Sequence, residues 1–356
     1  MSPLRRWRRR LAGWSLRWRR WEFWPLWAFY PPIVIWVSWL VLRHGGVSVF
    51  TAVNTGLWKA GVIGASKSRI LAALASCSDL VARSRLLAPD DDLDRRCESL
   101  AQAMGALDVH WPVVLKPDRG ARGQGVGIVR GPEQARAHLA IETGPLVLQE
   151  YVPGHEYGVF YARLPGEARG RIFSITDKRP AVVVGDGRRS IEELIYDDPR
   201  AVALARIYCE NLRERLEEVP APGQRVPLGE LGTHCRGAIF LDGHHLWTEA
   251  LERAVDRLAS AAEGFHFGRF DLRACSERAL REGRFKAIEL NGLVSEAAHV
   301  YDPSYSLLAA YRVLFRQWAL AAEIGRRQRR RGHPGTGFRQ ILRAALDIRR
   351  GVAAGR

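Results

Sequence analysis

Three oxygen-bearing side chains in the last third of the sequence are spaced as ligands of a divalent metal ion. Asp271 lies in GRFDLRA, and Glu289 and Asn291 lie in FKAIELN. Both stretches read as strands, so Asp271 should leave on the face opposite Phe270 and Leu272, and the other two should share one face. Carboxylate and amide oxygens suit Mg²⁺, which takes one or two carboxylates with phosphate oxygens and water. For any one of these residues alone, an ordinary strand-end hydrogen bond is the better reading.

A second candidate is the stretch Val113–Val129, VVLKPDRGARGQGVGIV. It reads as a strand that delivers Lys116, a glycine-rich turn and a second strand. The glycines stand at positions 120, 123, 125 and 127. Glycine lets several backbone N–H groups approach one anion, so the stretch fits a polyphosphate as well as it fits an ordinary hairpin. No GK[ST] follows a glycine loop, and no GxGxxG opens a helix here.

The charge of the chain is concentrated at its ends. The net charge is +16, yet residues 1–22 carry eight arginines and Glu22, and residues 326–356 carry ten arginines and Asp347. The region between is neutral, which argues against a basic groove for nucleic acid. The five cysteines form no CxxC pair, which favours a reducing compartment without structural zinc.

The N-terminal segment has the pattern of a basic helix with an aromatic face. Apolar residues recur at steps of three and four, with arginines between them: Leu4, Trp7, Leu11, Trp14, Trp18 and Trp21. Such a helix suits the surface of an anionic bilayer, with tryptophan at headgroup depth. A disordered arginine-rich leader or an RNA-binding arm is the alternative, and neither predicts this periodicity.

The segment Phe23–Leu42 follows without a charged residue. Its length meets that of a transmembrane helix, but Pro25, Pro31 and Pro32 divide it. We expect a re-entrant or interfacial segment, with a full span as the second reading and a buried core helix as the third. Arginines before the segment favour a cytoplasmic start.

Four local patterns predict the elements that position the candidate residues. Ser66 can cap a helix that begins at Lys67, and Ser190 with Glu193 forms a capping box. The stretch VVVGDGRRS reads as a hairpin, and residues 201–219 read as one long amphipathic helix.

In their order along the chain, these motifs resemble the ATP-grasp superfamily over about residues 64–310. The resemblance implies an α+β fold in which two α+β subdomains grip ATP between antiparallel sheets. Lys67 and Lys116 match its phosphate-contacting lysines, and residues 118–127 match its mobile glycine loop, with Gly120, Arg122, Gly123 and Gly125 as cofactor contacts.

The resemblance also implies roles for residues outside the loop. Glu150, Tyr151 and Val152 match the hinge against adenine, and Glu156 matches the ribose contact. Asp271, Glu289 and Asn291 match the magnesium ligands, which implies two Mg²⁺ ions, with Mn²⁺ as an alternative. Arg269 and Lys178 match groups on the phosphate side. Arg236 and Ser295 are candidate contacts for a substrate carboxylate, and His299, Tyr301, Asp302 and Tyr305 are candidates for an acceptor pocket.

The activity that the resemblance implies is an ADP-forming ligase that joins a carboxylate to an amine through an acyl phosphate. The segment VVVGDGRRSIEEL is similar to cyanophycin-synthetase-like ligases, and NGLVSEA is similar to D-alanine:D-alanine ligases. Small molecules or peptides are the expected substrates, at the cytoplasmic face of an inner membrane, and a homodimer is an open alternative to a monomer. A kinase that stops at phosphoryl transfer, a membrane scaffold that binds nucleotide without turnover and a nucleic-acid binder rank below it.

We predict three regions in the chain. These are a membrane-associated segment at 1–60, an ATP-grasp domain at 61–325 with its lid at about 110–148, and an arginine-rich tail at 326–356. Family members usually carry a complete α/β domain before the first lysine, whereas only about sixty residues precede Lys67 here. The acceptor side is therefore expected to be built from the N-terminal segment, a partner or a second copy of the chain.

Overall fold

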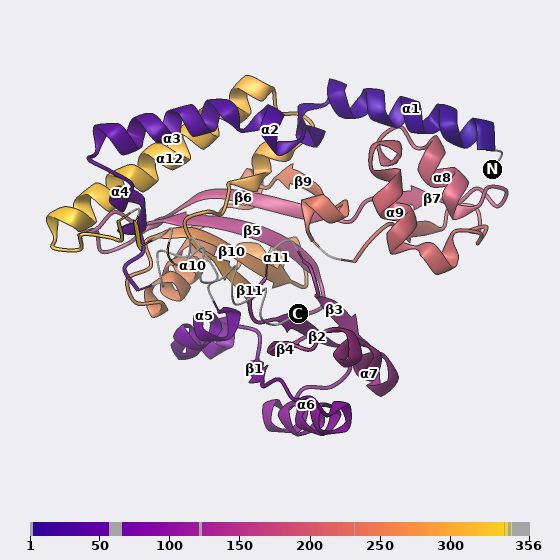
Figure 1. Cartoon of the computed structure of the whole chain (residues 1–356), viewed down its shortest axis with the longest axis horizontal. Coiled ribbons are helices and arrows are strands. Elements are labelled where there is room, and N and C mark those ends of the chain that lie inside the picture. Colours follow the sequence, from indigo (N-terminus) through magenta and orange to yellow (C-terminus); the bar gives the residue numbers. More distant parts are fainter. Residues whose placement is uncertain are drawn as a thin grey trace. The chain divides into compact units, whose positions relative to one another are not determined.

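The structure is a computed structural model that describes residues 3–56, 66–120, 123–230, 232–337, 339–340 and 343. The chain forms two compact units, each assembled from three separate segments. The first unit comprises Met1–Ile35, Asp177–Asp242 and Ala298–Val313, and the second comprises Trp36–Thr176, Gly243–Ala297 and Leu314–Arg356. Figure 1 shows the elements coloured along the sequence.

The second unit contains a small antiparallel sheet in the order β1-β4-β2-β3. Its strands are β1 (Ser84–Leu87), β4 (Leu146–Glu150), β2 (Val113–Pro117) and β3 (Gly127–Val129). Helices α6 (Leu93–Leu107) and α7 (Pro132–Ile141) share one apolar cluster with these strands. Val113 and Leu115 of β2 point into that cluster, so the alternation of a strand turns Lys116 to the other face.

The larger sheet of this unit carries β11 (Lys286–Asn291), β10 (Phe267–Ala274), β5 (His155–Ala162) and β6 (Arg171–Arg179) in that order. Helix α10 (Glu249–Ala261) packs against one face, together with α5 (Lys67–Ala73) and the 3₁₀ segment η3 (Ala75–Leu80). The shared core holds Tyr157 and Val159 of β5 and Phe270 and Leu272 of β10. Short helices α11 (Glu277–Arg281) and η7 (His244–Leu246) complete this part.

Two helices that continue from the first unit into the second also pack within the second. Helix α3 spans Pro31–Arg43 and α12 spans Leu307–Arg330, and α4 (Ser48–Thr51) follows α3. Trp36 Nε1 donates to the carbonyl oxygen of Phe315 at 3.0 Å. Asn54 fixes the start of β10, because its Oδ1 accepts from the amides of His266 and Phe267.

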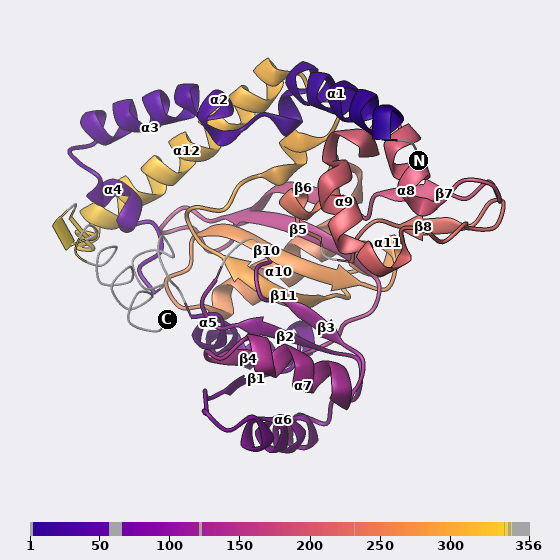
Figure 2. The same cartoon turned by 45° about the vertical axis from the view of Figure 1, so that its right-hand side comes forward.

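The first unit is built around α1 (Pro3–Arg19), which lies along the segment containing α8 (Ile191–Asp197) and η4 (Ala201–Leu204), as Figure 2 shows. A Cβ atom on Gly13 would come within 2.4 Å of the Val202 carbonyl oxygen, so glycine permits this close approach. The remaining elements are η1 (Trp21–Phe23), α2 (Leu26–Phe29), β7 (Val182–Val184), α9 (Ala205–Asn211), η5 (Arg213–Arg215), β8 (Arg225–Pro227), η6 (His234–Arg236), β9 (Ile239–Asp242) and η8 (Ala298–Tyr301).

Several local predictions are confirmed. Ser66 Oγ accepts from the Arg69 amide at the start of α5, and the capping box of Ser190 and Glu193 opens α8. The predicted hairpin is wrong, because β7 pairs with β8, a strand far along the chain, with Val183 opposite Val226. This pairing covers an apolar cluster that a local turn alone would leave exposed.

The predicted helix over residues 201–219 is also wrong. It is divided at Leu204 and Leu212, whose φ angles of −117° and −113° are not helical. The resulting pieces bury Ala201, Ala205 and Tyr208 in one cluster, and Tyr208 donates to the carbonyl oxygen of Gly237 at 2.8 Å. Tertiary packing therefore overrides the helical pattern of the sequence.

The apolar segment after α1 is broken where its prolines predict. It forms η1, α2 and α3, and α3 begins at Pro31. Within the part of the chain that the structure describes, no helix has the length and hydropathy to cross a membrane. The prolines divide Phe23–Leu42 into short helices, none as long as a straight transmembrane span.

Candidate active site

The predicted metal ligands lie together on one face of the larger sheet. Asp271 of β10 stands directly opposite Glu289 of β11, and Arg269 stands opposite Asn291. Phe270 and Leu272 point to the other face, into the core, as the alternation predicts. Glu156 of β5 is opposite Arg273 of β10, which places it on the face of Asp271 as well. The register therefore gathers side chains that are far apart in the sequence.

Asp271 is nearly buried and is held by two neighbours. Its Oδ1 accepts from Arg269 Nε at 2.8 Å, and its Oδ2 accepts from Asn291 Nδ2 at 3.3 Å. Burial by itself would lower the pKa of Arg269, but the charge and hydrogen bond of Asp271, with Glu289 nearby, raise it. Arg269 therefore stays cationic beside the carboxylates, where it can face an anionic group.

The two predicted phosphate lysines line one small pocket with Glu289. Lys116 Nζ donates to Gln149 Oε1 and to the Ile288 carbonyl oxygen, each at 2.9 Å. Burial lowers the pKa of Lys116 to about 8, Glu289 opposes this shift, and Lys67 adds to it. An anion bound beside Lys116 would raise its pKa again and so stabilise the charged form.

Lys67 is positioned by the start of the glycine loop. Its Nζ donates to the Gly120 carbonyl oxygen at 2.9 Å, and its amide donates to the Asp118 carbonyl oxygen at 3.0 Å. Burial would raise the pKa of Asp118, but hydrogen bonds from Ser68 and Ser66 hold it below its usual range. The Asp118 carboxylate thus ties the start of α5 to the loop.

The glycine loop connects β2 to β3 as an antiparallel pair, which confirms the strand, turn and strand order. Gly123 and Gly125 have φ angles of 69° and 67°, in the left-handed region that favours glycine. A Cβ on Gly125 would also come within 2.6 Å of Pro117 Cγ. Arg122, the remaining predicted contact of the loop, lies outside the described residues.

The predicted hinge follows β4. The Glu150 carboxylate accepts from the amide and Nε of Arg83 at 3.0 and 3.2 Å. Burial raises the pKa of Glu150, and these hydrogen bonds outweigh it and lower the pKa. The Arg273 guanidinium carbon lies 5.2 Å from the ring centre of Tyr151. Val152 continues the same loop, and the roles of these residues toward adenine stay predictions.

Two predicted catalytic residues belong to the first unit. Lys178, at the end of β6, is buried with its Nζ 5.8 Å from the ring centre of Phe240. Arg236 lies in η6, where its carbonyl oxygen accepts weakly from Asn211 Nδ2 at 3.4 Å. The residues named above lie in the second unit, and whether Lys178 and Arg236 act with them stays a prediction.

The predicted acceptor-pocket residues lie in the first unit. There the Tyr305 hydroxyl donates to Asp242 Oδ2 at 2.9 Å, and the Asp242 amide donates to Asp302 Oδ2 at 2.8 Å. His299 lies edge-on to Tyr305, with ring centres 5.4 Å apart. Ser295, a predicted contact for the substrate carboxylate, lies in the second unit, where it is buried and donates to the Gly292 carbonyl oxygen at 2.6 Å.

Sequence reasoning missed the residues that hold the lysines and the hinge. Gln149 contacts Lys116, and Arg83 holds Glu150. A signal existed for Gln149, since a polar residue directly after Leu146, Val147 and Leu148 in a buried strand requires a partner. Arg83 stands just before β1, a strand with no clear pattern, and nothing in its sequence context marks it.

The donor set fits a hard cation. Among the residues that the structure describes, no group of three or more His, Cys, Asp or Glu side chains is close enough to hold a metal. The predicted set instead combines two facing carboxylates with an amide, which leaves coordination positions for phosphate oxygens and water. The identity and number of ions stay predictions.

The chain is similar in part to several known ligases. No protein-family model matches the sequence. A cyanophycin synthetase from Geminocystis herdmanii (strain PCC 6308) is 29% identical over 93 residues, covering 24% of this chain and 10% of that protein. A bifunctional glutathione synthetase from Pasteurella multocida is 21% identical with a TM-score of 0.38, covering 73% of this chain and 38% of that one. The ATP-grasp ligase PsnB is 14% identical with a TM-score of 0.37, covering 71% and 60%.

The chain resembles the ATP-grasp carboxylate–amine ligases. Its mixture of helices and antiparallel sheets agrees with the α+β fold expected of them. The chain spans about a tenth of the cyanophycin synthetase and well under half of the glutathione synthetase. The predicted region boundaries at 60/61 and 325/326 stay predictions.

Proposed function

We propose that the chain is an ATP-dependent ligase that joins a carboxylate to an amine. A substrate carboxylate takes the γ-phosphoryl group of ATP, ADP leaves, and the amine displaces phosphate from the acyl phosphate to form an amide. Phosphoryl transfer needs positioning and charge neutralisation more than covalent help from the protein. The substrates are a small-molecule or peptide carboxylate and amine.

The observation that carries this function is the pocket shared by Lys67, Lys116 and Glu289. Two cations suited to phosphate oxygens stand beside a carboxylate that faces Asp271 across the β10–β11 pair. Asp271, Glu289 and Asn291 would hold Mg²⁺, which would supply positive charge at the transferring phosphoryl group. Arg269, bound to Asp271, would add a cation on the same face.

The test is ATP turnover by the purified full chain with Mg²⁺, with ADP and phosphate followed separately against pools of amino acids, peptides and amines. ADP and phosphate released together, and only when carboxylate and amine are both present, is the expected result. ADP without phosphate would replace the ligase by a kinase. Nucleotide binding without turnover would replace it by the scaffold reading.

We further propose that this ligase works at the cytoplasmic face of an anionic membrane. Support comes from the apolar face of α1 and α2, which we call the aromatic face. Its members are strongly exposed: Trp7, Leu11, Trp14, Trp18, Leu26 and Trp27, with exposed fractions of 41–71%. The opposite side of α1 packs within the first unit through Gly13. Large apolar side chains turned outward in this number are typical of an interaction surface.

Charge complementarity supports an anionic bilayer as the partner of the aromatic face. At 100° per residue, Arg8 and Arg19 flank the face on one side of α1, and Arg10 and Arg17 flank it on the other. Tryptophan at headgroup depth with arginine beside it fits an interfacial helix, which needs no span. Sedimentation with phosphatidylglycerol vesicles, weakened by salt and absent with phosphatidylcholine, is the expected result. Equal binding to both lipids would contradict it.

A further inference from the structure

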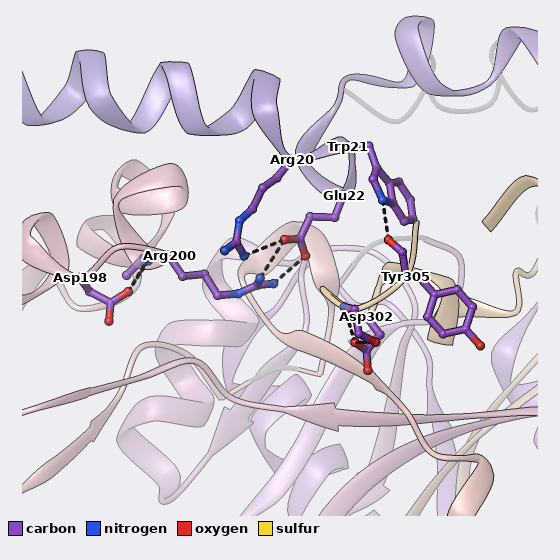
Figure 3. A network of polar contacts seen from close by, with 9 residues as sticks. Arg20, Trp21, Glu22, Asp198, Arg200, Asp302 and Tyr305 are labelled. Atoms are coloured by element: carbon purple, nitrogen blue, oxygen red, sulfur yellow. Dashed lines mark hydrogen bonds and ion pairs between the residues drawn. The ribbon is translucent and has the colours of Figure 1, made fainter. Parts of the chain in front are cut away.

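Within the first unit, side chains of residues 20–29 contact the region that carries the predicted acceptor residues. We call residues 298–305 the acceptor loop, since His299, Tyr301, Asp302 and Tyr305 all lie in it. Figure 3 shows two attachments that run from residues 20–22 to the rest of this unit. One is an ion pair to Arg200, and the other is a hydrogen bond to the acceptor loop.

The ion pair is buried and bidentate. Glu22 Oε1 and Oε2 accept from Arg200 Nη1 and Nη2, each at 2.8 Å, and the two residues are 178 positions apart. The Glu22 side chain is 4% exposed. Arg20 adds a second cation at 3.5 Å, and Phe23 lies under the Arg200 guanidinium with 5.2 Å to its ring centre. A planar fork of this kind fixes direction as well as distance.

The turn that carries Arg200 is stabilised by the side chain of Asp198. Asp198 Oδ1 accepts from the amides of Arg200 and Ala201 at 2.8 and 2.6 Å. Both ends of the ion pair are therefore fixed, since Glu22 stands in η1 and Arg200 in a capped turn. Loss of the pair would release the N-terminal segment at this point.

The second attachment reaches the acceptor loop directly. Trp21 Nε1 donates to the Tyr305 carbonyl oxygen at 3.0 Å. The Trp21 ring also stacks on Phe29 at 5.3 Å and lies 5.8 Å from Tyr301, measured between ring centres. Phe29 stacks in turn on Tyr311. Trp21 and Phe29 therefore support the acceptor loop by direct contact.

The contacts continue from the acceptor loop to η6. Tyr301 stacks on His234 with ring centres 4.9 Å apart, and His234 lies 5.2 Å from Phe240. Burial, with the charge of Arg200, lowers the pKa of His234 to about 4, so this ring is neutral at pH 7. His234 is two residues before Arg236, the candidate contact for a substrate carboxylate. One series of packed rings therefore joins Trp21 to that segment.

We propose that Trp21 and Glu22 are positioning residues for the acceptor side of the ligase. They act through the acceptor loop, and this inference rests on the proposed function. The acceptor substrate is a small molecule with an amine, and it would bind at the acceptor loop while Trp21 and Glu22 hold that loop in one conformation.

The experiment compares two conservative substitutions with matched controls. Glu22→Gln keeps the shape but removes the charge, and Trp21→Phe keeps a ring but removes the N–H donor. Glu218→Gln makes the same change at an exposed ion pair with Arg215 in the same unit. Trp247→Phe removes an indole hydrogen bond to Glu252 in the other unit. Steady-state kinetics with vesicles present give KM for the amine and for ATP.

Both test variants are expected to raise KM for the amine about tenfold, the effect of one lost hydrogen-bonded contact, and to leave KM for ATP within about twofold. The controls are expected to change neither constant. Amine and ATP constants that rise together, or an unchanged amine KM, would overturn the positioning role and leave only a contribution to stability.

Amide hydrogen exchange tests, without an activity assay, whether Trp21 and Glu22 stabilise the acceptor loop. The amides of Asp302 and Tyr305 donate to His299 and Asp302 in the acceptor loop. Their exchange is expected to be about tenfold faster in Glu22→Gln and Trp21→Phe and unchanged in the controls, because the loop loses its support. Unchanged exchange would overturn the inference. A wild-type chain without amine-dependent ADP release would refute the ligase, and exchange would still decide whether the N-terminal segment positions the loop.

Discussion

The face of β10 and β11 and the aromatic face of α1 and α2 place their side chains in opposite ways. At the first, charged side chains are buried: Asp271 of β10 is 5% exposed, and Lys116 of β2, whose Nζ donates to the Ile288 carbonyl oxygen of β11, is 6% exposed. On the second, large apolar side chains are turned outward, with Trp14 at 64% and Trp27 at 71%. Both placements oppose the usual distribution of residue types in a protein.

The two faces stabilise their unusual placements by different means. Each buried charge has protein partners, such as Gln149 and the Ile288 carbonyl oxygen for Lys116. Removal of a partner would leave an uncompensated polar group, so this face is rigid. The exposed tryptophans contact one another, as Trp18 and Trp27 do with ring centres 5.9 Å apart. We infer that the first face serves chemistry and the second serves attachment.

The largest expected effect comes from Glu289→Gln. This change removes a charge from the pocket while it keeps the shape, and we expect ADP release to fall by at least about a hundredfold, as when one preorganised electrostatic group is removed. Turnover followed by ADP release measures this. Glu282→Gln, at an exposed pair with Arg278 outside the site, is the matched control and should retain turnover. Similar losses in both variants would show that the assay reports a general loss of folding.

An intermediate effect is expected for the aromatic face. Joint replacement of Trp14, Trp18 and Trp27 by Ala should weaken binding to phosphatidylglycerol vesicles by about tenfold or more, because each ring loses burial at the interface. ADP release in solution should remain. Trp247→Ala removes a tryptophan of similar exposure from another part of the chain and should bind vesicles normally. Undiminished vesicle binding by the triple variant would assign attachment to another surface.

The smallest effect is a pH dependence from Lys116. Burial lowers its pKa to about 8, so the cation that binds phosphate is present below pH 8 and is lost as pH rises above it. KM for ATP is expected to rise several-fold between pH 7 and 9. In Lys116→Arg the charge persists over this range, so the pH dependence should disappear even if affinity is lower. A wild-type KM that stays constant to pH 9 would contradict this assignment.

Much of the candidate site follows from local sequence. The strand with Lys116, the glycine turn and the cap at Ser66 are each specified within a few residues, and all three are confirmed. The broken apolar segment is predictable for the same reason, since Pro31 acts on its own neighbours. The long helix over 201–219 fails because burial of Ala201 and Tyr208 against other segments outweighs local helical preference.

Alternation along each strand determined, by itself, that Asp271 leaves the core and that Glu289 and Asn291 share a face. The periodicity of the N-terminal segment likewise determined that Trp7, Leu11, Trp14 and Trp18 share one face, whereas Trp27 of α2 meets Trp18 only in the tertiary structure. Only the tertiary structure decided that Asp271 faces Glu289, that Gln149 holds Lys116 and that Glu22 meets Arg200. Periodicity depends on residues within one segment, so the sequence of that segment reveals it. Strand register and ion pairs join residues that are far apart in the sequence, so neither segment by itself indicates the contact.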